Sequence, residues 1–145
     1  MGHRGSLHVR ALLILVAVLW STGCAREPDE QALRRTLGEM VAAIEVREGS
    51  RFMASVAGDF AGPHDMDRDG LHRMVRLNML QNQAIGVTTG PLDVKLMADR
   101  AELNFSALLT GGSGRLLPDQ ARTYQVSTGW RHEGGRWMLI SARWE

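Results

Sequence analysis

The stretch that decides the fold is GWRHEGGRWMLISARW, residues 129–144. It contains two segments rich in aromatic and β-branched residues, separated by the turn-forming residues EGG at 133–135. Two such segments around a short glycine-containing turn are typical of an antiparallel β-hairpin. The sequence therefore predicts strands at 122–132 and 136–144, joined by a tight turn.

The segments before this hairpin alternate with the same period of two. PLDVKLM at 91–97 and RAELNFSALLTG at 100–111 each read as a strand. In the second segment one face is entirely apolar: Leu103, Phe105, Ala107 and Leu109. The loop 111–120 that follows is glycine-rich but carries Leu116 and Leu117, which would either cover a pocket or contact a partner.

The first half of the domain has a helical period instead. Pro28 and the acidic residues after it favour a helix start, and an apolar stripe then continues until Gly49. We expect a second, short helix from Ser50 to about Gly58 and a third after Asp67. The stripe residues of the first helix are Leu33, Leu37, Met40, Val41 and Ile44.

HDMDRDG at 64–70 matches the first half of an EF-hand calcium loop. Such a loop needs a bidentate Glu at its twelfth position, and counting from Asp65 that position is Arg76. We therefore expect no metal ion and no cofactor. Asp67 instead stands where a helix N-cap belongs, and Asp69 lies in the first turn, where the helix dipole favours an acid.

Helices followed by antiparallel strands indicate an α+β domain. This order, together with the closing hairpin 129–144, resembles the nuclear transport factor 2-like (NTF2-like) superfamily over residues 28–145. The resemblance implies a cystatin-like cone: three N-terminal helices packed on a curved antiparallel sheet around an apolar pocket. Members include isomerases, dehydratases and noncatalytic binding or assembly modules, so the fold alone does not name an activity.

The first 23 residues have the layout of a signal peptide. Arg4 and Arg10 precede an apolar run at 11–20, and the small residues STG lead to Cys24, the only cysteine in the chain. This site resembles the lipobox of bacterial lipoproteins, which implies that Cys24 is acylated and that residues 24–27 form a tether. With Ala25 after the cysteine, the resemblance favours an outer-membrane lipoprotein facing the periplasm.

Removing this leader leaves a nearly neutral protein. The chain has 17 basic and 16 acidic residues, and the leader contains two of the arginines and none of the acids, which leaves 15 and 16. A near-neutral domain with interspersed charges has no electrostatic footprint for nucleic acid. The expected partners are the membrane, a small apolar ligand and a second copy of the chain.

A set of side chains is expected to line the pocket. Asn78 and Asn82 fall within the apolar arc of the third helix, and their amides either bond the backbone or meet a ligand. Tyr124 shares a strand face with Trp130, so its hydroxyl is expected to point inward. The predicted pocket residues are Phe60, Asn78, Asn82, Tyr124 and Trp130.

Two residues are candidate acid–base groups. His72 lies three residues after Asp69 on the third helix, and Asp59 lies near the expected pocket rim. With Tyr124 as a donor, either would support an isomerase or dehydratase. The entirely apolar strand face argues instead for a noncatalytic ligand-binding or assembly module, with an adaptor of an envelope complex as a third reading.

The last strand predicts homodimerisation. Counting by two places Trp137 and Leu139 on one face, and Met138, Ile140 and Trp144 on the other. A strand that is apolar on both sides is expected to be covered on both sides. Either a second copy covers the outer face, or the loop 111–120 folds over it and leaves a monomer.

Overall fold

In the computed structural model, the residues described are 29–115 and 117–145. The predicted signal peptide (1–23), Cys24 and the tether (24–27) lie outside this range, as does Leu116. Within the described part of the chain, no helix is long and apolar enough to cross a membrane.

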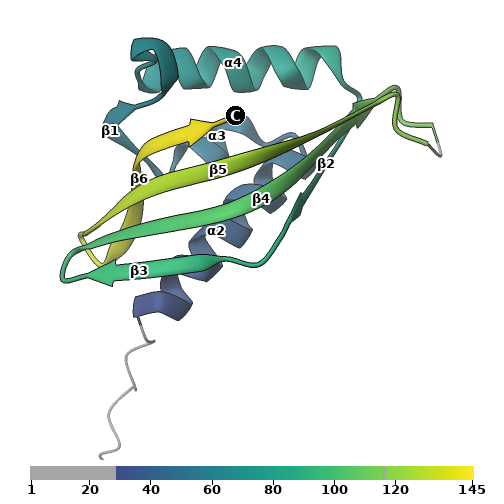
Figure 1. The fold of residues 1–145 in the computed structure, drawn as a ribbon. Helices are drawn as coiled ribbons and strands as arrows, with labels where there is room; N and C mark the ends of the chain where they lie inside the picture. The colour runs from purple at the N-terminus through teal and green to yellow at the C-terminus, as the bar shows by residue number, and fades with distance from the viewer. Residues whose placement is uncertain (1–28, 116) are drawn as a thin grey trace, which may run out of the picture.

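The described chain contains helices in its first half and most of its strands in the second (Figure 1). The helical elements are α2 (Asp29–Glu45), α3 (Gly49–Met53), a short 3₁₀ turn η1 (Pro63–Asp65) and α4 (Arg68–Gln81). The strands are β1 (Val56–Ala61), β2 (Ala84–Thr89), β3 (Asp93–Met97), β4 (Arg100–Gly112), β5 (Gln120–Glu133) and β6 (Arg136–Trp144).

The six strands form one curved sheet, in which five follow the order β1-β6-β5-β4-β2 and β3 pairs with β4. The long strand β4 pairs with β2 through its second half and with β3 through its first half, so β2 and β3 follow each other along one edge. All pairings are antiparallel except that of β1 with β6, which is parallel. The α+β class with a curved, mainly antiparallel sheet is thus confirmed.

The helix predictions were partly wrong at their ends. Of the predicted α2 stripe, Leu33, Leu37 and Met40 are buried, and Val41 and Ile44 are half-buried. The helix ends at Glu45, because Arg47 adopts a left-handed backbone conformation (φ 62°) before Gly49 is reached. The second helix also stops early, at Met53. Val56, which was assigned to that helix, begins β1, and the backbone N–H of Leu139 in β6 bonds to the Ser55 carbonyl just before it, at 2.8 Å.

The start of α4 is confirmed. Asp67 has an extended backbone and its Oδ1 accepts a hydrogen bond from the backbone N–H of Gly70 at 2.7 Å. This is the geometry of an N-cap. Asp67 and Asp69 therefore belong to the start of α4, whereas Asp65 ends the 3₁₀ turn η1. The described residues contain no group of three or more His, Cys, Asp or Glu side chains that could hold a metal ion.

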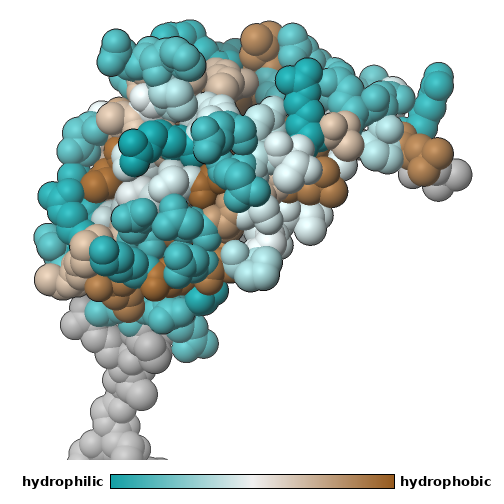
Figure 2. Space-filling model, viewed as in Figure 1, coloured by the Kyte–Doolittle hydropathy of each residue, from teal (hydrophilic) through white to brown (hydrophobic). Residues whose placement is uncertain are grey.

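The outer face of the sheet, turned away from α2, is mostly polar. Figure 2 looks onto this face, and hydrophilic and neutral colours predominate over it. Arg131 lies on this side and forms a bidentate ion pair with Asp59 of β1, with distances of 2.9 and 3.0 Å. The ion pair spans from β5 to β1 across the intervening strand β6.

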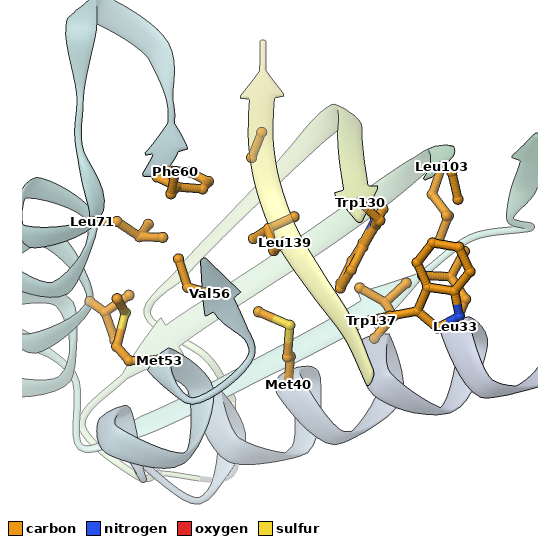
Figure 3. Close-up of a cluster of buried hydrophobic side chains, with 14 of the residues drawn as sticks. Leu33, Met40, Met53, Val56, Phe60, Leu71, Leu103, Trp130, Trp137 and Leu139 are labelled. Atoms are coloured by element: carbon orange, nitrogen blue, oxygen red, sulfur yellow. The ribbon is translucent and has the colours of Figure 1, made fainter. Parts of the chain in front are cut away.

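The inner face packs on α2 and forms the core (Figure 3). Trp130 and Trp137 are almost completely buried there, together with Leu33 and Leu103. The indole N–H of Trp130 donates to the Thr128 hydroxyl at 2.8 Å, and that of Trp137 donates to the Asp29 carbonyl at 3.0 Å. Both buried donors are therefore satisfied, as burial of a polar group requires.

A β-bulge in β6 changes which side chains of this strand face inward, so the predicted faces were partly wrong. Gly129 pairs with Ser141 and Trp130 pairs with Leu139, so Ile140 has no partner of its own. The extra residue shifts the alternation by one. Ala142 and Trp144 consequently lie on the inner side, where they join Leu139, and the expectation that Trp144 faces outward was wrong.

Candidate functional site

A cavity of about 350 Å³ lies between the inner face of the sheet and the helices. The apolar stripe of α2 forms one wall and α4 forms another, while β4, β5 and β6 contribute the inward side chains of their alternating pattern. The volume is at the lower end of the range for ligand pockets, about 300–1,000 Å³. The cavity therefore has the size of a small organic molecule.

The lining is almost entirely apolar. Aliphatic, aromatic and methionine side chains surround the space, and the polar side chains among them are Asn78, Thr89, Tyr124 and Thr128. None of the described lining residues is Asp, Glu, His, Lys, Arg or Cys. Such a surface favours an apolar ligand with few polar atoms, because a charged group would lose its hydration there without gaining a partner.

The polar side chains in the wall differ in how far they are already bonded. Thr128 is fully engaged, since its hydroxyl accepts from Trp130 and donates to the Leu103 carbonyl at 3.3 Å. The hydroxyl of Tyr124 makes no hydrogen bond to any described residue, and the side-chain N–H groups of Asn78 have no acceptor there either. These two side chains can orient a polar atom of a ligand.

Three of the five predicted pocket residues line the cavity: Asn78, Tyr124 and Trp130. Phe60 does not, because β1 places its ring in the buried core. Asn82 also lies outside the lining. It follows the last turn of α4 with an extended backbone, and its amide donates back to the Asn78 carbonyl at 3.0 Å while packing on the backbone of Gly111.

Neither candidate acid–base residue lies in the lining. Asp59 is exposed in the middle of β1, and its hydrogen bonds with Arg131 hold the pKa of this carboxyl below its usual value. His72 is half-buried on α4 and has no hydrogen bond or ion pair to the described residues. Among the described lining residues, no ionisable side chain that could accept a proton therefore lies beside Tyr124 in the cavity.

Several lining residues were predicted only as core. Leu37, Met40, Val41 and Ile44 of α2 belong to the predicted stripe, but a stripe has the same sequence pattern whether it fills a core or borders a cavity. Trp144 was missed because of the bulge. Gly129, opposite the bulge, was the available signal, since an isolated glycine within a strand pattern suggests one.

No protein-family model and no curated protein matches this sequence. Among solved structures, Bd1075 of Bdellovibrio bacteriovorus matches at a TM-score of 0.71 and 11% identity, over 79% of this chain and 40% of Bd1075. This chain therefore spans less than half of the length of Bd1075.

Two further solved structures match over most of both chains. A proposed scytalone dehydratase of Novosphingobium aromaticivorans has a TM-score of 0.73 and 11% identity, over 81% of this chain and 83% of its own. An NTF2-like protein of unknown function from Pseudomonas putida has a TM-score of 0.68 and 17% identity, over 80% and 84%. At these identities the likeness shows the fold alone, and that fold is NTF2-like.

Proposed function

We propose that this protein binds an apolar small molecule in the cavity between α2, α4 and the sheet, and that it does so without catalysing a reaction. The observation that carries the proposal is the apolar lining, in which Tyr124 and Asn78 keep donors that no described residue accepts from. Burial of apolar ligand surface is favourable by about 25 cal/mol per Å². A few fixed polar groups then select the orientation of the ligand.

The absence of an ionisable partner among the described lining residues is the reason to prefer binding over catalysis. General acid–base catalysis requires a group that exchanges a proton near the working pH and lies within hydrogen-bond reach of the substrate. The two candidates for that role, Asp59 and His72, are outside the lining.

The location we propose is the cell envelope, with the domain held at the periplasmic face of the outer membrane by an acylated Cys24. This part rests on the sequence: the apolar run at 11–20, the small residues before Cys24 and the lack of any other cysteine. We expect Cys24→Ser to move the protein from the membrane fraction to the soluble fraction. Equal retention of the variant in membranes would contradict the anchor.

Ligand binding can be tested with two neighbouring substitutions on opposite faces of β4. Ala107 is buried and lines the cavity, whereas Leu108 is 39% exposed and is absent from the lining. We expect Ala107→Phe to fill the cavity and lower the affinity for the neutral fluorescent probe N-phenyl-1-naphthylamine by about ten-fold or more. Leu108→Phe is the control, and binding that responds equally to both changes would contradict the proposal.

A catalytic function is the second candidate, because the Tyr124 hydroxyl has no hydrogen bond to the described residues and one solved protein of this fold is named a proposed scytalone dehydratase. Tyr124→Phe keeps the ring and removes the donor. For a binding protein we expect it to weaken only ligands with a polar group. If a dehydratase or isomerase assay gave turnover that fell about 100-fold in this variant, the enzyme would be the correct reading.

A further inference from the structure

A second cavity, of about 270 Å³, lies on a neighbouring face of α2. It is bordered by α2, by the connection from α3 to β1, and by the turn from β5 to β6. It shares only Met40 with the apolar cavity. The two sites can therefore be tested separately.

The charge of this second cavity is its distinguishing feature. Arg35 of α2, Arg51 of α3 and Arg136 of β6 all line it, while Glu39 is the acid among its described lining residues. Among the described lining residues, positive charges therefore outnumber negative ones by three to one. The three arginines come from three separate elements, so only the folded chain brings them together.

Two of these arginines hold no strong ion pair within the described residues. Arg51 lies 3.3 Å from Glu48, and both side chains are more than half exposed. Exposed pairs of this kind contribute little, because solvent screens them. Arg136 forms no ion pair with the described residues. An anion bound by Arg51 and Arg136 would therefore not have to break a strong contact.

We propose that this cavity binds the phosphate group of an anionic phosphate ester. The planar guanidinium of arginine donates two parallel hydrogen bonds to phosphate, which makes it the preferred side chain for this group. The cavity also has apolar walls, formed by Trp137, Met40 and Ala54. These walls suit the carbon part of an ester better than a bare inorganic ion.

The position of the cavity favours a phospholipid headgroup as the source of that phosphate. Trp137 lines the cavity and its indole N–H bonds to the carbonyl of Asp29, the first described residue. Cys24 precedes Asp29 by five residues, which span at most about 18 Å when extended. This step rests on the proposed acylation of Cys24, whereas the recognition of phosphate does not.

The test uses the mature protein in neutral maltoside micelles and follows its melting temperature. In separate arms we add inorganic phosphate, phosphatidylglycerol, or diacylglycerol as the lipid without phosphate. A ligand that binds only the folded state raises the melting temperature by mass action, here by about 2–5 °C at saturation. We expect this rise with phosphatidylglycerol and none with diacylglycerol. An equal rise with inorganic phosphate supports the same site with a soluble source.

Variants connect the response to the cavity. We expect Arg136→Gln and Arg51→Gln each to lower the apparent affinity for the phosphate group by about ten-fold, the loss expected for one charge-assisted contact. Arg143→Gln is the matched control, because Arg143 is exposed on the same strand as Arg136 and is absent from the lining. The proposal is overturned if no phosphate source stabilises the protein, or if the double variant Arg136→Gln/Arg51→Gln responds like the wild type.

The outcomes also separate this proposal from the proposed function. The inorganic phosphate arm requires neither an acylated Cys24 nor the apolar cavity. Loss of naphthylamine binding in Ala107→Phe should leave the phosphate response unchanged, and the arginine variants should leave naphthylamine binding unchanged.

Discussion

At the scale of single residues, Asp67 shows how a metal-like motif is explained by helix capping. Its carboxylate accepts the Gly70 N–H that no earlier carbonyl of the helix can accept. We expect Asp67→Ala to reduce the free energy of unfolding by about 1 kcal/mol in urea denaturation. Asp67→Ser keeps an acceptor and should lose only a few tenths. A serine variant as unstable as the alanine variant would show that capping is not the role of this residue.

The ion pair of Asp59 with Arg131 gives a prediction for pH. Hydrogen bonds from Arg131 lower the pKa of the Asp59 carboxyl in the folded protein below the value of about 3.9 expected in the unfolded chain. A lowered folded pKa means that the pair stabilises the protein above that unfolded value. The contribution is lost as the pH falls from about 4 towards the folded pKa.

We therefore expect the melting temperature of Asp59→Asn to lie below that of the wild type at pH 6, and this difference to shrink as the pH falls below about 4. Both measurements need low salt, because the Asp59 side chain is 64% exposed and its charge is readily screened. A difference that stays constant from pH 6 to pH 3 would mean that the substitution acts through something other than this charge.

At the scale of elements, the sequence predicted the strands that alternate clearly and missed the two that do not. The strands at 93–97, 100–112, 120–133 and 136–144 all lie within two residues of the predicted ends. They were predictable because apolar and polar residues alternate along each of them, with a period of two. β1 and β2 were missed, since each contains a glycine and neither shows a clear alternation.

β2 depends on a contact that no local pattern reveals. It is an edge strand, and the backbone N–H of Val87 donates to the carboxylate of Glu45 at the end of α2, at 3.0 Å. We expect Glu45→Ala to speed hydrogen exchange of the Val87 amide, because its acceptor is removed. Glu45→Gln retains an acceptor oxygen and should exchange more slowly than the alanine variant. Equal exchange in all three proteins would contradict this role of Glu45.

At the scale of the whole molecule, the position of the site was predictable and its composition only in part. Alternation on β4 and β5 identified the inward faces, including Tyr124 and Trp130. It could not show where the interior is filled and where it is open, because that depends on how far α4 stands from the sheet. Asn82 illustrates this: its helical phase pointed inward, but the helix had already ended.

The homodimer stays a prediction, and fewer apolar residues on the outer side of β6 support it than the sequence pattern indicated. Trp144 lines the cavity, so the apolar residues left on the outer side of β6 are Met138 and Ile140, both half-buried. Leu117 is 79% exposed, so it does not cover that face either. Sedimentation of the domain at tens of micromolar would measure the state directly. We expect the dimer mass, and a clean monomer mass would contradict it.

The bulge at Ile140 has a consequence for chain length. Because this residue has no partner on β5, β6 contains one residue more than its pairing with β5 requires. Deleting Ile140 removes this extra residue and still leaves Ala142 and Trp144 facing inward. We therefore expect the variant to keep a cooperative thermal unfolding transition. β5 has no such extra residue. Deleting Gln125 from it would turn Tyr124, and every residue before Tyr124 on the strand, to the opposite face of the sheet. We expect this variant to lose the cooperative thermal transition. β6 should therefore tolerate the loss of one residue, whereas β5 should not.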